Sequence, residues 1–308
     1  MDKLRIIATL TATLMISLSG LSQQVPGENF YQINPFSVNP AAAGINRNIS
    51  AYMDYRDQWS GLKGAPETIR FGLHGLVTRD MGVGLHVDQN NTGIFKQFSV
   101  DLDYSYRVAL NSDEQSLSFG LSFGFFQNKI NYDNVIIGTE MDPSLYSSNL
   151  FDEALVRTGF GVHYNYNDLN IHLASPLLYT TQEKKFLQNL YGLATYDFYL
   201  ADNVWKVQPS VLYKYSYGSR GQADISVMGE WKGRLWAMAG YRTNRSILTG
   251  FGINFSYFGI GYAYEVNRSQ LSSISSGSHG IVLYFNSPYS LTKKEPLYRS
   301  STRRNPWN

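Results

Sequence analysis

The sequence predicts an all-β protein: a single transmembrane antiparallel β-barrel of about 14 strands. Apolar and polar residues alternate along 14 separate segments, and the connections between them alternate between short and long. Only 16 % of the residues are charged, against about 25 % in a typical soluble domain. A period of two puts alternate side chains on opposite faces of a strand. In a membrane barrel one of those faces meets lipid and the other meets the lumen.

Residues 1–22 have the form of a secretory signal peptide. Lys3 and Arg5 precede a short apolar run over 6–18, and small residues follow it before Gln23. This order is typical of an export signal, and the run is shorter than the ~20 apolar residues that a spanning helix needs. We expect cleavage just before Gln23. The chain has no cysteine, so we expect neither a lipid-anchoring thiol nor a disulfide.

Residues 23–47 are predicted to form a periplasmic lead-in that plugs or seals the lower end of the barrel. Two Asn-Pro pairs, Asn34-Pro35 and Asn39-Pro40, favour extended or turn geometry, because proline restrains itself and the residue before it. The small run Ala41–Gly44 follows them.

The barrel itself is predicted over residues 48–286. Its clearest strand is 98–108, where Phe98 and Val100 alternate with Ser99 and Asp101. The candidate strands are 49–56, 69–77, 83–88, 98–108, 117–125, 156–166, 169–175, 189–200, 204–217, 223–231, 234–242, 246–257, 258–266 and 278–286. A soluble β-sandwich also has alternating strands, but its polar face would normally carry more Lys and Glu.

The connections predict the orientation. The short ones are 78–81, 111–115, 167–168, 201–203, 232–233 and 257–258, and the longer ones are 60–66, 89–95, 127–153, 176–188, 218–222, 243–245 and 267–277. Outer-membrane barrels have short periplasmic turns and longer outer loops, and an even strand number puts both ends on one side. We therefore expect both termini in the periplasm and the 127–153 loop on the cell surface.

Residues 287–308 are predicted to be a basic periplasmic tail. Five basic residues stand there against Glu295 alone: Lys293, Lys294, Arg299, Arg303 and Arg304. Together with Trp307, these charges suit docking of a partner through charge and aromatic contacts. The alternative is a disordered, solvated end.

The titratable residues do not predict an enzyme. His74 and His86 lie on adjacent candidate strands near Asp88, and such a set can activate water. However, no serine lies in a recognisable nucleophile motif, and inward polar residues are expected in any barrel lumen. His163 and His172 flank a tight turn and are expected to pair across it. We expect no catalytic residues, no cofactor and no metal site, since metal-ligand spacings are missing.

Three motifs occur in order along the chain. The first comprises Asn39, Pro40, Ala41, Ala43 and Gly44; the second comprises Tyr55, Arg56, Gln58, Trp59, Gly61, Gly64, Ala65, Pro66 and Thr68; the third comprises Ser276, Gly277, Ser278 and His279. We expect Arg56 to point into the lumen with Asp54, and Trp59 to lie at the membrane boundary, which suits an amphipathic ring. The alternative is an ordinary hairpin without a partner.

Together these motifs resemble the PorP/SprF family of the type IX secretion system, although Gly280 stands where the family pattern has Glu. The resemblance implies an outer-membrane β-barrel that supports export or surface anchoring of large adhesins or other cargo in gliding and surface-secreting bacteria. Its implied partners are other secretion components in the periplasm and outer membrane, adhesin-like cargo and the lipid bilayer. The alternatives are a porin-like or hydrophobic-ligand transport channel and an outer-membrane hydrolase.

Overall fold

The computed structural model describes residues 27–110, 115–130, 154–181, 187–243, 245–267 and 275–287. Two short 3-10 helices, η1 (Pro35–Ser37) and η2 (Pro40–Ala42), precede the strands. The strands are β1 Ser50–Asp57, β2 Glu67–Leu76, β3 Met81–Thr92, β4 Phe95–Ala109, β5 Gln115–Ile130, β6 Ala154–Tyr166, β7 Leu169–Thr180, β8 Asn189–Tyr196, β9 Phe198–Leu200, β10 Trp205–Ser216, β11 Gln222–Trp231, β12 Leu235–Arg242, β13 Ser246–Asn254, β14 Phe258–Asn267 and β15 Ser278–Asn286. Among the described residues no helix is long and apolar enough to cross a membrane.

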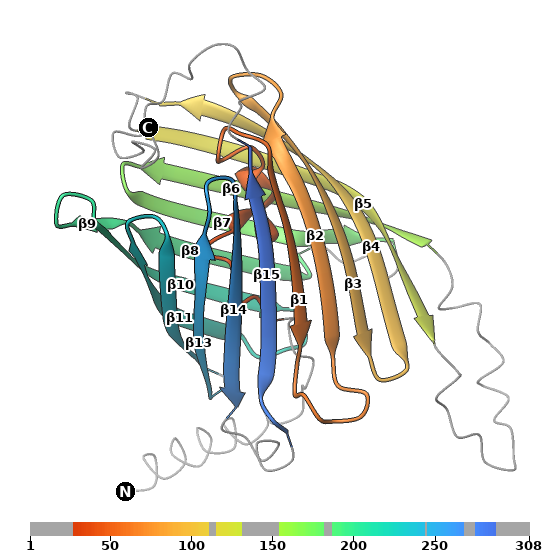
Figure 1. Ribbon diagram of the computed structural model, residues 1–308. Helices are drawn as coiled ribbons and strands as arrows, with labels where there is room; N and C mark the ends of the chain where they lie inside the picture. Colours follow the sequence, from red (N-terminus) through yellow and green to blue (C-terminus); the bar gives the residue numbers. More distant parts are fainter. Residues whose placement is uncertain are drawn as a thin grey trace, which may run out of the picture.

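The strands close into one antiparallel barrel (Figure 1). β1 pairs with both β2 and β15, and β10 joins β8 to β11. β8 and the short β9 both pair with β10, so they are two parts of one wall strand interrupted at Asp197. The wall therefore has 14 strands, and the predicted fold class and strand number are confirmed.

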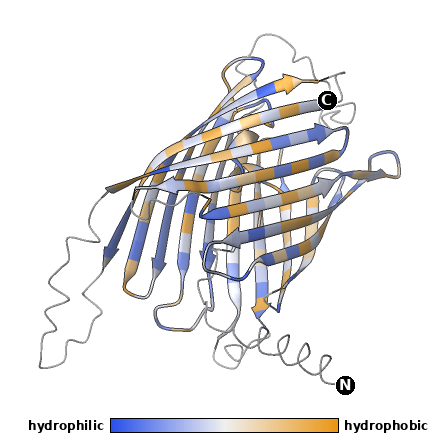
Figure 2. Ribbon diagram, turned by 180° about the vertical axis from the view of Figure 1, so that it is seen from behind, coloured by the Kyte–Doolittle hydropathy of each residue, from blue (hydrophilic) through white to orange (hydrophobic). Residues whose placement is uncertain are grey.

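The wall is apolar outside and polar inside, which is the reverse of a soluble protein. Along β4, Ser99, Asp101 and Asp103 are buried towards the lumen, whereas Leu102 is 64 % exposed on the outer face. Figure 2 shows apolar and polar bands alternating along the strands in this way. An outward apolar band over a polar interior is the pattern of a transmembrane barrel, so the faces predicted from the alternation are confirmed.

Several predicted boundaries are wrong, and two cases show why. The expected loop 89–95 belongs to β3 and β4, which pair up to Thr92 and Phe95 and leave only a two-residue connection with Gly93 at φ 61°. Polar residues there continue the ladder beyond the apolar band. The strand expected to end at 175 continues through Pro176 to Thr180 after a register shift against β6. An irregularity in pairing is where a strand tolerates proline.

Residues 27–49, called the plug below, lie inside the barrel (Figure 1). Tyr31 and Phe36 are each 1 % exposed, although η1 and η2 are the plug's only helical turns in the described chain. The barrel end where β1 finishes and β2 begins is called the loop-side mouth. The end where β1 begins and β15 finishes is called the turn-side mouth. The plug reaches from one mouth to the other.

Candidate functional site

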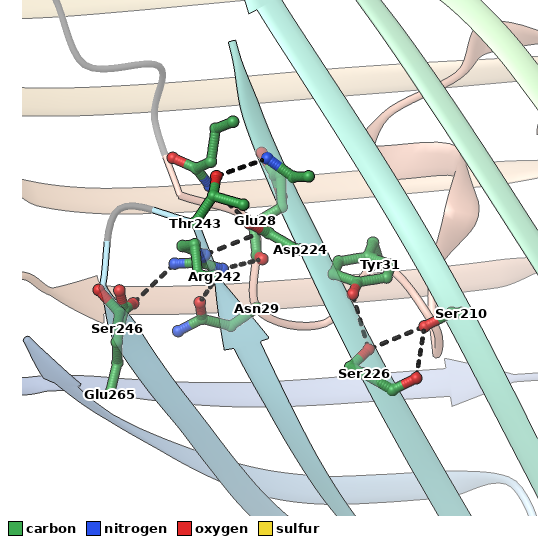
Figure 3. Close-up of polar contacts among 12 residues, drawn as sticks. Glu28, Asn29, Tyr31, Ser210, Asp224, Ser226, Arg242, Thr243, Ser246 and Glu265 are labelled. Atoms are coloured by element: carbon green, nitrogen blue, oxygen red, sulfur yellow. Dashed lines mark hydrogen bonds and ion pairs between the residues drawn. The ribbon is translucent and has the colours of Figure 1, made fainter. Parts of the chain in front are cut away.

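The plug begins in a cluster of buried charges near the loop-side mouth. Arg70 Nη1 donates to Glu28 Oε2 over 2.6 Å, and Arg242 Nη2 donates to the Glu28 carbonyl over 2.9 Å. Arg242 also reaches Asn29 Oδ1 at 3.3 Å (Figure 3). Burial raises the pKa of the Glu28 carboxyl above its ordinary value, and the positive charge of Arg70 opposes that shift. Two wall arginines thus fix the start of the plug.

Acidic wall residues hold these arginines in turn. Glu265 Oε2 accepts from Arg242 at 2.7 Å and from Arg56 at 2.8 Å, and Asp224 lies 3.0 Å from Arg242. All of these side chains are buried. Because a buried charge without its partner is costly, the cluster ties β1, β11, β12 and β14 to the plug. Arg56 points into the lumen, as predicted from its position in the second motif.

Apolar contacts hold the next part of the plug. Phe30 packs on a cluster of inward side chains from β11–β15: Met228, Trp236, Met238, Leu248, Ala263 and Val282. Tyr31 packs on Leu193 and Leu212 of the neighbouring strands β8 and β10, and its hydroxyl lies 2.7 Å from Ser226 Oγ (Figure 3). A porin-type lumen is polar and wet, whereas this stretch of inner wall is apolar and faces plug side chains.

Glycines on the inner wall make room for the rest of the plug. A Cβ atom added at Gly120 would lie 2.1 Å from Ala41 N, and one added at Gly82 would lie 2.2 Å from the Ala43 carbonyl oxygen. Gly84 and Gly161 are equally tight, against Phe36 at 2.3 Å and against Asn39 Oδ1 at 1.9 Å. An added side chain would press on plug backbone at Gly82 and Gly120 and on plug side chains at Gly84 and Gly161, so part of the plug would have to shift at each of these four positions. They are called the glycine seat below.

Hydrogen bonds from the first motif complete this seat. Asn39 Oδ1 accepts from Ala41 N at 2.9 Å, while its Nδ2 donates to the Val162 carbonyl at 2.9 Å. Gly44 N donates to His74 Nδ1 at 3.0 Å. The glycine seat was not predicted from the sequence, although glycines at inward positions of the run SLSFGLSFGF indicate it.

The histidines serve this packing. His86 Nδ1 lies 2.8 Å from Asp103 Oδ2, but the ring of Phe36 stacks on His86 at 3.9 Å. Within the described residues, His86 Nε2 has no hydrogen-bond partner. His163 and His172 stack at 4.1 Å, which confirms their predicted pairing. No group of metal-ligating side chains gathers in the described part of the chain.

The second and third motifs meet at the loop-side mouth. Ser60 N donates to the Gly277 carbonyl at 2.7 Å, and Ser276 N donates to the Ser60 carbonyl at 2.9 Å. Trp59 N donates to Ser278 Oγ at 3.1 Å. Trp59 has a φ of 57°, is half-buried, and its indole nitrogen has no partner among the described residues. These hydrogen bonds join the β1–β2 hairpin to the loop before β15, and the contact is called the hairpin strap below.

The remaining motif residues support this strap or face outwards. Gln58 N donates to the Pro66 carbonyl and Ala65 N to the Leu62 carbonyl, while Gly93 N donates to the Gly64 carbonyl. Gly61 and Gly64 have φ values of 90° and 77°, which favour glycine. Tyr55 lies on the outer face, and His279 bonds Tyr262 there at 2.6 Å. The basic tail residues Lys293, Lys294, Arg299, Arg303, Arg304 and Trp307 and the signal peptide lie outside the described residues.

The plug divides the lumen into two cavities. One of about 520 Å³ opens at the turn side and is lined by Asn46, Asn165 and Tyr284 among others. One of about 440 Å³ lies on the loop side, with Asp88 and Arg157 in its wall. The plug contributes Asn34 to the first cavity and Phe36 to the second. In the described part of the chain, the buried plug thus lies between these two cavities.

Comparison with protein families matches residues 20–285 to a family described as the type IX secretion system membrane protein PorP/SprF. No curated protein matches the chain.

Solved structures of membrane barrels are similar. Outer membrane phospholipase A from Escherichia coli has 9 % identity and a TM-score of 0.40, covering 82 % of this chain and 100 % of that one. Omp33 from Acinetobacter baumannii has 6 % identity and a TM-score of 0.47, covering 78 % and 97 %. A mutant porin of Rh. blastica has 10 % identity and a TM-score of 0.35, covering 78 % and 99 %. At such scores these likenesses carry no functional meaning for this chain.

Proposed function

This chain belongs to the PorP/SprF family of type IX secretion system membrane proteins, and from that premise we propose that it supports secretion or surface anchoring of specific large, adhesin-like cargo. Its outer-membrane barrel acts as a docking platform for cargo and for other secretion components, and not as the conduit. The observation that carries this reading is the plug, whose residues Tyr31 and Phe36 are each 1 % exposed inside the lumen.

The plug inside the lumen argues against the porin-like or hydrophobic-ligand channel. A large cargo chain would have to displace Phe30 from its apolar cluster and Glu28 from two arginines. We expect the purified barrel in planar bilayers to conduct ions far less than an open porin. Sustained porin-level conductance by the intact chain would contradict the platform and favour the channel.

A hydrolase is the other alternative, because His86 and Asp103 form a hydrogen-bonded pair. Phe36 covers that histidine, which supports a packing role for it. Replacing His86 with Asn is expected to leave any lipid hydrolysis by outer-membrane preparations unchanged. Loss of a hydrolytic activity in that variant alone would favour the hydrolase.

Affinity purification from native outer membranes tests the proposal directly. We expect periplasmic secretion components and a very large cargo protein to accompany the tagged barrel. A chain lacking residues 290–308 should still insert but recover fewer periplasmic partners, and high salt should weaken recovery further because it screens exposed charges.

The matched control for this deletion keeps the tail length and replaces its five basic residues with Gln. If the charges carry the interaction, both variants should lose partners and export. Full export and unchanged recovery in both would reduce the tail to a solvated end.

A further inference from the structure

We infer that the exported chain threads its own barrel, so that its amino-terminal end and its carboxyl-terminal tail leave through opposite mouths. This differs from the expectation that both termini lie on one side. The inference rests on the predicted signal cleavage before Gln23 and not on the role in secretion. It assigns each chain end to its own side of the membrane.

The amino-terminal end of the plug lies at the loop-side mouth. Gly27 is so close to Arg56 that a Cβ atom there would lie 1.6 Å from Arg56 Nη1. Arg56 is the next-to-last residue of β1, beside the loop-side mouth. The Glu28 carbonyl accepts from Arg242, the last residue of β12, which pairs with the first residue of β13 at the same mouth.

The carboxyl-terminal end of the barrel lies at the turn-side mouth. Ser287 N donates to the Ile49 carbonyl at 2.8 Å, directly before β1 begins. One residue earlier, Asn286 Oδ1 accepts from Ser50 Oγ at 2.7 Å. The even strand number does bring β1 and β15 together at one mouth, but the plug carries the chain from there to the other mouth.

The end cannot turn back through the lumen. Cleavage before Gln23 leaves four residues ahead of Gly27, and four residues reach at most about 14 Å. Return to the turn-side mouth along the eight-residue β1 requires roughly 26 Å. The lumen on that path holds the buried side chains of Tyr31 and Phe36. The described chain therefore begins at the loop-side mouth, with Gly27 beside Arg56.

The consequence is a division of partners between the two sides. If the short turns face the periplasm, as in other outer-membrane barrels, the amino end emerges at the cell surface beside the hairpin strap of Ser60 and Gly277. The basic tail emerges in the periplasm. A ligand for the amino end then approaches from outside the cell, and a ligand for the tail approaches from the periplasm.

Single-cysteine labelling tests this inference cleanly, because the chain has no cysteine of its own. The two probes are Gln24→Cys and Ser300→Cys. The two reporters are Lys63→Cys, exposed in the loop-side hairpin, and Ser256→Cys, exposed in the turn between β13 and β14. Each variant is treated with a membrane-impermeant maleimide on intact cells and again after permeabilisation.

We expect Gln24→Cys to label under the same condition as Lys63→Cys, and Ser300→Cys to label with Ser256→Cys. Labelling of Gln24→Cys together with Ser256→Cys overturns the inference, and so does its failure to label under either condition. Gln23→Cys provides a second probe if the first variant does not insert. Because labelling does not depend on export, failure of the secretion proposal leaves this result readable.

Discussion

Two parts of the plug are held in the barrel by different means. Residues 28–34 send side chains into the wall, where Glu28 meets Arg70 and Phe30 enters an apolar cluster. Along residues 36–44, by contrast, the plug backbone itself lies against the wall, directly over the glycines Gly82 and Gly120. Ala41 N at Gly120 is the tightest backbone contact of this kind.

The difference teaches which substitutions each part tolerates. Removing one partner of a buried charge pair lowers the stability of the docked plug strongly. Neutralising the other partner as well restores part of that stability. A close contact between the plug and a wall glycine is lost whenever a side chain is added at that glycine, whatever its chemistry, because packed interiors have little free volume. The predictions below separate these two behaviours, using heat-modifiable gel mobility for barrel stability and bilayer conductance for release of the plug.

Removal of Arg242 should have the largest effect. Arg242→Met leaves Glu265 and Asp224 buried with less compensation and frees the Glu28 carbonyl. Loss of one partner of a buried pair costs about 3–5 kcal/mol. We expect a lower unfolding midpoint and higher conductance than in the unaltered protein.

The double variant Arg242→Met/Glu265→Gln is the control for charge pairing. It should recover part of the loss, although Arg56 then loses its charged partner. If the double variant were less stable than the sum of both single changes, pairing would not explain how this part of the plug is held.

Filling the glycine seat comes next. Gly120→Val should expel the plug or strain the wall, because its Cβ would lie 2.1 Å from Ala41 N; overpacking of this kind costs about 3 kcal/mol. The matched control is Gly229→Val on β11, where no atom lies within 4 Å of an added Cβ. Raised conductance for Gly120→Val alone is the expected result. Equal conductance of the two variants would mean that the glycine seat does not hold the plug.

The wall was predictable from the sequence because its cause is local. Alternation with a period of two depends only on neighbouring residues and on which solvent each face meets. The alternation along 98–108 therefore gave the orientation of Asp101 and Leu102 correctly. The 89–95 boundary failed because polar residues such as Asn90 extend the strand beyond the apolar band, where alternation carries no hydrophobic signal.

The path of the plug was not predictable in the same way. Its contacts join residues far apart in sequence, such as Asn39 with Val162 and Glu28 with Arg242. Neither the Asn-Pro pairs nor the inward glycines indicate which plug residue contacts which wall glycine. The small residues on an otherwise polar face do indicate that something fills the space, and Gly120 and Gly84 are the sites where that sign was present.

Loss of the Asn39 side chain should have a moderate effect. Asn39→Ala removes the bond to the Val162 carbonyl and the cap on Ala41 N, which together are worth about 2 kcal/mol. Asn34→Ala is the control, because the Asn34 side-chain nitrogen has no partner among the described residues. We expect plug release to rise for Asn39→Ala only. An equal rise for Asn34→Ala would mean that amide volume, and not bonding, seats the motif.

Neutralising Glu28 should have the smallest effect. Gln at position 28 still accepts from Arg70, and Arg70 keeps Asp54 and Asp88 at 3.8 Å, so we expect a loss of no more than about 1 kcal/mol. Burial raises the Glu28 pKa in the docked plug, so the docked state binds a proton more tightly than the released one. Docking by the unaltered protein should therefore strengthen relative to Glu28→Gln as the pH falls. Conductance of both proteins between pH 7 and pH 4 measures that difference, in which the other titrating groups cancel. A difference that moves in the opposite direction would show that pairing with Arg70 outweighs burial at this carboxylate.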